Sequence, residues 1–307
     1  MSSPLPHQNS IAQTTVNRIL ALRLGIFAHR IHRGSAPAAR RLAADDLGQG
    51  KPQRRSGPIW RMIYSTAMPI QALIFDFDGL ILDTETPLVD VWQAIYEENG
   101  FEYPKEHWSI TIGGWGNGQF DPAAALHQLS SGNLDYETLR RRGDDESNAI
   151  INAAPVMKGA REILAAGKQR GLRLAIASSS EREWVEPHLA RLGLLDYFEK
   201  VVCGDDVAPG RTKPYPDVFL KALSELHLAP DEALVLEDSP NGITAARQAG
   251  LAVVAIPNPV TRLLPMEGAD LTLDSLDAMP LDEILERVAR ARGGAVPNSS
   301  PAPQPLT

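Results

Sequence analysis

Two aspartates separated by one residue, Asp76 and Asp78, are the first residues of the chain whose types and spacing could do chemistry. They lie at the end of an apolar run, Ala72–Phe77, that is typical of a buried parallel strand. Side chains two residues apart in a strand share a face, so both carboxylates could point the same way. Two carboxylates so close repel each other unless a cation lies between them or one of them holds a proton. The pair suits magnesium-assisted phosphoryl transfer, with one aspartate as nucleophile and the other as acid/base. The alternative is a strand that simply ends in an acidic Asp-Gly turn.

Polar residues also end two later apolar strands, where Ser178 follows one and Glu237 with Asp238 follows the other. Parallel strands share a direction, so all these ends can lie on the one edge of the sheet where open α/β folds place their chemistry. Lys213 lies in the loop between two such strands and could reach the same crevice. Together these side chains offer oxygen ligands for a divalent cation, and a hydroxyl and an ammonium for phosphate oxygens.

Each of these residues also has a purely structural explanation. Ser178 could be a helix N-cap, since Glu181 lies three residues on as in a capping box. Lys213 could be a solvated lysine, and Glu237 and Asp238 could simply start the next helix. Their coincidence at the ends of parallel strands favours the chemical interpretation.

Alternating strands and helices are expected to position these residues. The strands are expected at Ala72–Phe77, Leu172–Ala177, Lys200–Cys203, Ala233–Leu236 and Ala252–Ile256. The helices between the later strands are expected at Gly159–Arg170, Glu183–Leu192, Val218–Leu226 and Gly242–Gln248. Repeated strand–helix units of this length predict an α/β fold with a doubly wound parallel sheet.

A segment without strand signals separates the first strand from the others. Apolar residues at helical spacing from Leu88 to Tyr96 predict a helix that Asn99-Gly100 ends, and Pro122–Leu129 resumes a helical pattern. An insertion of roughly 70 residues is too long for an ordinary loop and indicates a small separate domain. We therefore expect a helical cap at residues 87–154 and an α/β core at residues 68–86 and 155–290.

Charge and composition narrow the class of protein. The chain has 307 residues and a net charge of -8, but residues 1–67 hold 10 Lys and Arg against 2 Asp. The remaining residues therefore carry a strong negative charge, which argues against nucleic acid as a partner. No apolar run is long enough to predict a membrane-spanning helix. The single cysteine, Cys203, precludes an internal disulfide, permits a reducing compartment, and is expected to be buried after Val201-Val202.

The two ends of the chain are expected to be disordered. Residues 1–67 are rich in arginine and poor in acidic residues, as in an organelle transit peptide. The alternative is that translation starts at Met68, just before the first strand, and that residues 1–67 are not part of the functional chain. We favour the second explanation, which predicts a cytoplasmic protein. Residues 291–307 are small and proline-rich and are expected to form a disordered tail.

Four motifs in a fixed order carry a resemblance to a known family. They are Phe75-Asp76-Phe77-Asp78-Gly79, Ala177-Ser178-Ser179, Lys213-Pro214 and Leu236-Glu237-Asp238-Ser239. They resemble the motifs of the haloacid dehalogenase superfamily of phosphohydrolases, and the resemblance covers nearly all of residues 68–290. The insert is similar to the cap of the branch that contains β-phosphoglucomutase and phosphoglycolate phosphatase. The implied fold is a Rossmann-like core with a small inserted α-helical cap.

The resemblance also implies a role for each motif residue. Asp76 would attack phosphorus and form an aspartyl-phosphate, and Asp78 would protonate the leaving oxygen and later deprotonate water. Mg²⁺ would be held by three groups: Asp76, the main-chain carbonyl of Asp78, and Asp238, with Glu237 adjacent. The residues implied to bind the transferring phosphoryl group are Ser178, Ser179 and Lys213.

Three alternatives to a phosphatase fit the motif and cap residues less well. A true dehalogenase works without a metal and has no need of Asp78 or of Glu237 and Asp238. A phosphomutase of this branch binds a second phosphate with a cap arginine, which the corresponding stretch 112–117 lacks. A non-enzymatic member would be expected to have lost a motif residue, and none is missing.

We therefore expect a Mg²⁺-dependent phosphatase that acts on a small phosphorylated metabolite, with a sugar phosphate favoured and a β-phosphoglucomutase-like mutase as the alternative. Trp115, Asn117 and Gln119 of the cap could contact such a substrate, although Trp115 could equally pack inside the cap. The protein is expected to be a monomer, without nucleic-acid or membrane partners.

Overall fold

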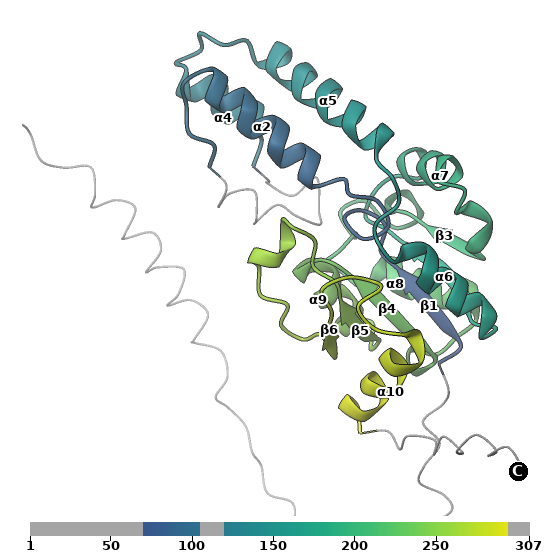
Figure 1. The fold of residues 1–307 in the computed structure, drawn as a ribbon. Coiled ribbons are helices and arrows are strands. Elements are labelled where there is room, and N and C mark those ends of the chain that lie inside the picture. The colour runs from purple at the N-terminus through teal and green to yellow at the C-terminus, as the bar shows by residue number, and fades with distance from the viewer. Residues whose placement is uncertain (1–69, 105–119, 294–307) are drawn as a thin grey trace, which may run out of the picture. The chain divides into compact units, whose positions relative to one another are not determined.

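The strands of the described residues form one six-stranded sheet in a computed structural model that describes residues 70–104 and 120–293 (Figure 1). Its spatial order is β3-β2-β1-β4-β5-β6, and every pairing in it is parallel. The strands are β1 (Ala72–Phe75), β2 (Arg173–Ala177), β3 (Lys200–Val202), β4 (Ala233–Glu237), β5 (Ala252–Ala255) and β6 (Leu271–Thr272). All four residues of β1 are buried, as expected of a central strand that is covered on both faces.

Helices cover both faces of this sheet. They are α6 (Ala160–Gln169), α7 (Arg182–Arg191), α8 (Asp217–Leu226), α9 (Pro240–Gln248) and α10 (Leu281–Ala291). Alternate residues of β1 belong to two different hydrophobic clusters: Leu73 and Phe75 pack with α6, α7 and α10, while Ala72 and Ile74 pack with α8 and α9. The predicted doubly wound α/β fold is therefore confirmed.

Between β1 and α6, the described residues form three further helices: α2 (Thr86–Glu98), α4 (Pro122–Leu129) and α5 (Tyr136–Ala153). They share a hydrophobic cluster of their own, in which Trp92, Ile95 and Tyr96 of α2 are the large buried side chains. The Tyr96 hydroxyl donates a hydrogen bond of 2.7 Å to the carbonyl oxygen of Pro122, which ties α2 to α4. The described residues of the insert are thus mainly helical, and the domain boundaries expected for it at residues 87–154 stay a prediction.

The largest difference from the expected elements lies at the first motif. β1 ends at Phe75, two residues before the expected Phe77, so strand alternation does not govern the directions of Asp76 and Asp78. The amide of Asp76 still donates to the carbonyl oxygen of Leu236 at 3.0 Å, and Asp78 forms an isolated bridge with Leu82. After Asp78 the backbone folds back through Gly79, whose φ of +75° allows the turn.

Other boundaries differ less, and the elements without a prediction of their own include β6, α10 and, inside the expected helical insert, α5. The remaining four expected strands lie within one residue of the observed ones at each end, whereas β6 and α10 follow the last element predicted. α10 ends at Ala291, inside the tail expected at residues 291–307. The leader, the cap stretch 112–117 and residues 294–307 lie outside the described part of the chain, and so do the expected substrate contacts Trp115, Asn117 and Gln119.

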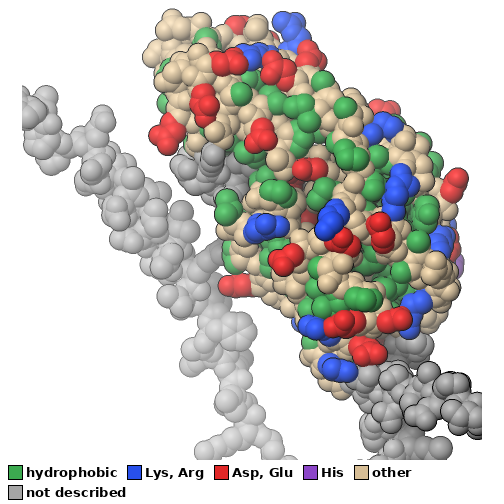
Figure 2. All heavy atoms as spheres, in the orientation of Figure 1, with side chains coloured by type: hydrophobic (Ala, Val, Ile, Leu, Met, Phe, Trp, Pro, Cys, Tyr) green, Lys and Arg blue, Asp and Glu red, His purple; other side chains and the backbone are tan. Residues whose placement is uncertain are grey.

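The described surface is mixed in charge. On the face shown in Figure 2, acidic and basic side chains of the coloured residues are interspersed rather than gathered by sign. Charged side chains of the described residues also form ion pairs along helices, such as Arg182 with Glu186 and Lys221 with Glu225. Among the helices of the described residues, none is long and apolar enough to cross a bilayer.

Candidate active site

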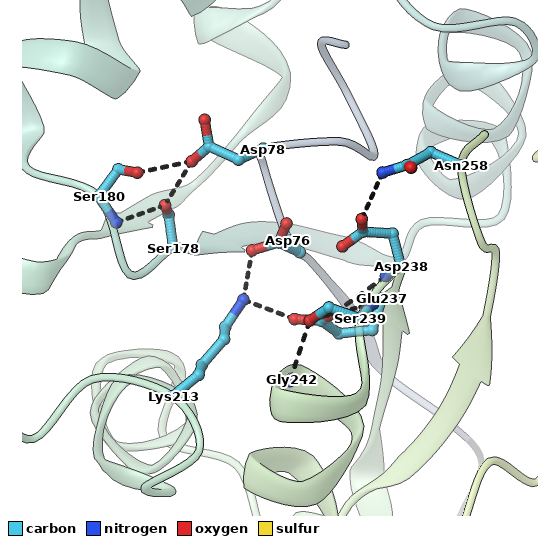
Figure 3. Close-up of polar contacts among 10 residues, drawn as sticks. All are labelled: Asp76, Asp78, Ser178, Ser180, Lys213, Glu237, Asp238, Ser239, Gly242 and Asn258. Carbon is cyan, nitrogen blue, oxygen red and sulfur yellow. Dashed lines mark hydrogen bonds and ion pairs between the residues drawn. The ribbon is translucent and has the colours of Figure 1, made fainter. Parts of the chain in front are cut away.

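Three of the predicted site residues meet at the carboxyl edge of the central strands. Asp76 directly follows β1, Glu237 ends β4, and Lys213 lies in the segment that leads into α8 (Figure 3). The Lys213 ammonium donates to Oε1 of Glu237 at 2.6 Å and to Oδ1 of Asp76. Lys213 is only 3% exposed, so its explanation as a solvated lysine is wrong.

Glu237 is fixed by the start of the helix that follows it. Its Oε2 accepts hydrogen bonds from the amides of Asp238 and Ser239, at 2.9 and 3.0 Å, and from the Ser239 hydroxyl at 3.0 Å. Ser239 is also the N-cap of α9, where its Oγ accepts from the amide of Gly242 at 3.1 Å. The helix thus starts from Ser239, whereas Glu237 and Asp238 turn their carboxylates into the site.

A second group of polar contacts surrounds Asp238. Asn258 donates from its side-chain Nδ2 to Oδ2 of Asp238 and to Oε2 of Glu85, both at 2.7 Å. The Asn258 Oδ1 accepts from the amides of Val260 and Thr261, at 2.8 and 2.9 Å, which fixes the amide orientation. The sequence does not indicate Asn258, because an isolated asparagine between two prolines carries no signal of its partners. Glu85 could have been identified from the sequence, because it belongs to the acidic segment Asp83-Thr84-Glu85 shortly after the first motif.

Close packing at this point requires a glycine. A Cβ on Gly79 would lie 2.5 Å from both Nδ2 of Asn258 and Oδ2 of Asp238. Gly79 also has a left-handed φ of +75°. The Asp-Gly sequence, which could indicate an ordinary turn, therefore also makes room for the carboxylate of Asp238.

Asp78 has a different environment from Asp76. Its Oδ2 accepts from the hydroxyls of Ser180 at 2.7 Å and Ser178 at 3.3 Å (Figure 3), and its Oδ1 accepts from Nε1 of Trp184 at 2.9 Å. Neither Ser180 nor Trp184 was singled out from the sequence. The only available signal was that Ser180 continues a run of three serines after β2.

The two other serines of this run lie beside the site. The Ser178 Oγ accepts from the amide of Ser180 at 2.9 Å, and α7 begins only at Arg182, so the explanation of Ser178 as its N-cap is wrong. The Ser179 Oγ is buried and has no hydrogen-bond partner among the described residues. That Ser178, Ser179 and Lys213 bind phosphate stays a prediction.

Negative charge outweighs positive charge in this site. Burial raises the pKa of Asp76 to about 8; Lys213 opposes that shift, and the nearby carboxylates Glu237 and Asp78 add to it. Burial likewise raises the pKa of Glu85 to about 8, against the hydrogen bond from Asn258. Burial and the neighbouring carboxylates, with Glu85 the strongest among them, also hold the pKa of Asp238 well above its usual range. Such a site would be stabilised by a further cation.

The donor set fits Mg²⁺. Carboxylate oxygens of Asp76, Glu237 and Asp238 lie within 4.8 Å of one another, and all three residues are buried. Hard oxygen ligands with excess negative charge are what Mg²⁺ prefers. The carboxylate of Asp78 is not part of this cluster. The ligand expected from Asp78 is its main-chain carbonyl oxygen, and its coordination of Mg²⁺ stays a prediction.

Fold and site together define a class of protein. A doubly wound sheet with clustered carboxylates at the carboxyl edge of its central strands is typical of an α/β enzyme with an acidic, cation-assisted site. The family model described as Haloacid dehalogenase-like hydrolase matches residues 73–256. The chain belongs to this family, and the predicted enzyme class, a hydrolase of the haloacid dehalogenase type, is confirmed.

Individual relatives support the same assignment. The chain is 39% identical over 219 residues to a Bacillus subtilis protein named "Putative phosphatase YhcW", covering 71% of this chain and 98% of that protein. It is 31% identical over 184 residues to the Escherichia coli Fructose-1-phosphate phosphatase YqaB, covering 60% of this chain and 95% of that protein. The crystal structure of CbbY from Rhodobacter sphaeroides in complex with phosphate is 29% identical, with a TM-score of 0.51, covering 67% of this chain and 95% of that one.

Proposed function

We propose that this protein is a Mg²⁺-dependent phosphatase that hydrolyses a small phosphorylated metabolite through an aspartyl-phosphate on Asp76. The observation that carries the proposal is the buried contact of Lys213 with Asp76 and Glu237, beside the carboxylate of Asp238. The ammonium beside Asp76 suits the neutralisation of charge on a phosphoryl group, and the excess of carboxylates suits the divalent cation that would neutralise the rest.

In the first half of the proposed reaction, an oxygen of Asp76 attacks phosphorus while the bond from phosphorus to the leaving oxygen breaks. Lys213 faces the charge that gathers on the phosphoryl oxygens, and Ser178 and Ser179 bind the same group. Asp78 gives its proton to the leaving oxygen. Bound Mg²⁺, held by Asp76 and Asp238, would neutralise further negative charge on the phosphoryl group.

In the second half, Asp78 takes a proton from a water molecule whose oxygen attacks phosphorus. The bond between phosphorus and Asp76 breaks, which restores the carboxylate and releases inorganic phosphate. Each aspartate thus returns to its starting state, and the reaction consumes one water molecule per ester. Lys213 keeps its proton throughout, because the two adjacent carboxylates outweigh burial and hold its pKa above the ordinary value.

A helical cap at residues 87–154 would enclose the substrate and exclude water. The two connections between this insert and the core run beside each other, because Leu82 bridges to Val156 and the amide of Met157 donates to the carbonyl oxygen of Ile81 at 2.9 Å. We infer that hinges lie next to this pairing, near 84–87 and 153–156. A sugar phosphate is the proposed substrate class, because a fructose-1-phosphate phosphatase is among the relatives.

Phosphate release from a panel of sugar phosphates, phosphoglycolate and nucleotides, with Mg²⁺ and with EDTA, tests the proposal. Release that requires Mg²⁺ and is confined to a narrow group of sugar phosphates is the expected result. Conversion of a hexose 1-phosphate to its 6-phosphate without release would instead assign a mutase. Release that is equally fast in EDTA would contradict the metal-dependent site. Size-exclusion chromatography with light scattering checks the expected monomer.

A further inference from the structure

The carboxylate of Asp78 accepts hydrogen bonds on both of its oxygens, and the donors differ in kind. Oδ2 faces two serine hydroxyls, from Ser180 at 2.7 Å and Ser178 at 3.3 Å. Oδ1 faces the indole nitrogen of Trp184 at 2.9 Å. All three donors come from the segment that runs from the end of β2 into α7.

This difference assigns separate roles to the two oxygens. A serine hydroxyl can donate or accept a hydrogen bond, whereas an indole N–H can only donate. Oδ1 therefore remains an acceptor at every stage, while the partners of Oδ2 can reverse when that oxygen carries a proton. Oδ2 is the oxygen that can deliver a proton, and it lies on the side of Ser178, where the phosphoryl group is proposed to bind.

Packing, and not only the hydrogen bond, sets the direction of the indole. Trp184 makes an edge-to-face contact with the ring of His188, one turn further along α7, with ring centroids 4.5 Å apart. The His188 ring in turn lies 6.3 Å from that of Phe77, the fully buried residue between the two aspartates. The chain of rings thus holds the N–H in place relative to the motif that carries Asp78.

We propose that Trp184 is a positioning residue that turns Asp78 so that Oδ2, and not Oδ1, exchanges the proton with the leaving oxygen. The inference rests on the proposed phosphatase function. In the forward step the Oδ2–H bond breaks as the proton moves to the leaving oxygen, while phosphorus passes from that oxygen to Asp76. The indole N–H keeps its proton throughout and holds the other oxygen of Asp78.

Replacing Trp184 by β-(3-benzothienyl)alanine, which has sulfur in place of the indole N–H, tests this role with little change of shape. The test compares kcat/KM for the best sugar phosphate with kcat/KM for p-nitrophenyl phosphate. The alkoxide of the sugar needs a proton to leave, whereas p-nitrophenolate does not. We expect kcat/KM to fall about 10- to 100-fold for the sugar phosphate, and by less than about threefold for the aryl ester.

Matched variants separate positioning from folding. W184F, which also lacks the donor, should show the same dependence on the leaving group, and Glu183→Ala, an exposed neighbour on α7, should leave both values unchanged. Equal losses on both substrates, or no loss on either, would overturn the positioning role while the phosphatase function stands. If the unmodified protein with Mg²⁺ releases phosphate from neither substrate, the proposed function itself fails, and this inference with it.

Discussion

Asp76 and Asp78 are two residues apart, yet the tertiary structure gives them different partners. Asp76 is buried against Lys213 and lies among further carboxylates, whereas Asp78 faces the hydroxyl and indole donors of another segment. Environment rather than residue type separates the roles of paired carboxylates in an active site. At the scale of the residue, the contacts therefore support Asp76 as the nucleophile and Asp78 as the acid/base.

Asp76→Asn tests the nucleophile. An amide has the size of the carboxylate but does not attack phosphorus, so we expect phosphate release to fall by at least about four orders of magnitude. The thermal midpoint without Mg²⁺ should stay the same or rise, because the substitution removes one carboxylate from a buried cluster of like charges. Release above about one per cent of the unmodified rate would refute the role.

Lys213→Met tests the buried cation. Its loss leaves Asp76 and Glu237 buried without their counter-charge, and breaking a buried ion pair in this way costs about 3–5 kcal/mol. Urea unfolding at neutral pH measures the change in the free energy of unfolding.

Lys221→Met provides the matched control for that measurement. Lys221 is an exposed residue of α8 that pairs with Glu225 along the helix, and its replacement should change stability by less than about 0.5 kcal/mol. Equal effects of the two substitutions would show that Lys213 contributes no more than a surface lysine.

At the scale of the element, the junction of β4 with α9 determines where Glu237 lies. The strand ends at Glu237, Ser239 caps the helix, and the amide of Gly242 donates back to the cap. A Cβ on Gly242 would lie 1.7 Å from Oε1 of Glu237. The helix can approach the carboxylate only because position 242 has no side chain.

Gly242→Ala should therefore damage both the fold and the site. Glu237 cannot move aside without losing the hydrogen bonds that hold it, so we expect a cost of about 1–3 kcal/mol, and phosphate release reduced at least tenfold. Gly167→Ala in α6 is the matched control, because its Cβ would meet a terminal methyl of Leu174 at 2.9 Å, and that methyl can shift. We expect Gly167→Ala to cost less than about 1 kcal/mol and to retain activity. Equal stabilities of the two variants would contradict the close approach.

At the scale of the whole molecule, the sheet separates two hydrophobic clusters, and the single cysteine lies in one of them. Cys203 follows β3, is fully buried, and packs in the cluster that contains Leu73 and Phe75. Burial raises the pKa of its thiol to about 12. The expectation from sequence that Cys203 is a buried core residue is confirmed, and the residue can report on the opening of the core.

Alkylation of Cys203 should follow global unfolding. A buried, protonated thiol does not react, so iodoacetamide at neutral pH should leave the native protein unmodified and label it only as denaturant exposes the core. Mass spectrometry across a urea series measures the labelled fraction. Rapid labelling without denaturant would show that this part of the core opens locally.

Alkaline stability gives a second test of the same burial. The thiol ionises near 9 when unfolded and only near 12 in the folded protein, so the unfolded state loses its proton first. The raised pKa therefore contributes stability that is fully present below pH 9 and is lost as pH rises from 9 toward 12. Cys203→Ala should show a smaller loss of unfolding free energy over that range; an identical pH dependence would contradict the prediction.

The sequence by itself determined the fold class, the four motifs and most element positions. Apolar runs such as Ala233–Leu236 have one stable place in a soluble α/β protein, a strand covered on both faces, and polar residues that end such strands gather at one edge. Asp76, Glu237 and Lys213 could be predicted to meet, because topology alone brings their segments together.

Only the tertiary structure decided the partners of each carboxylate. Asn258 contacts Asp238 and Glu85, and Trp184 contacts Asp78, across separations of 20, 173 and 106 residues. Contacts of this kind depend on how loops and helix faces pack, and an asparagine or tryptophan has the same local sequence signal with or without such a partner. Strand patterns specify which ends meet, whereas side-chain packing across distant segments specifies which atoms do.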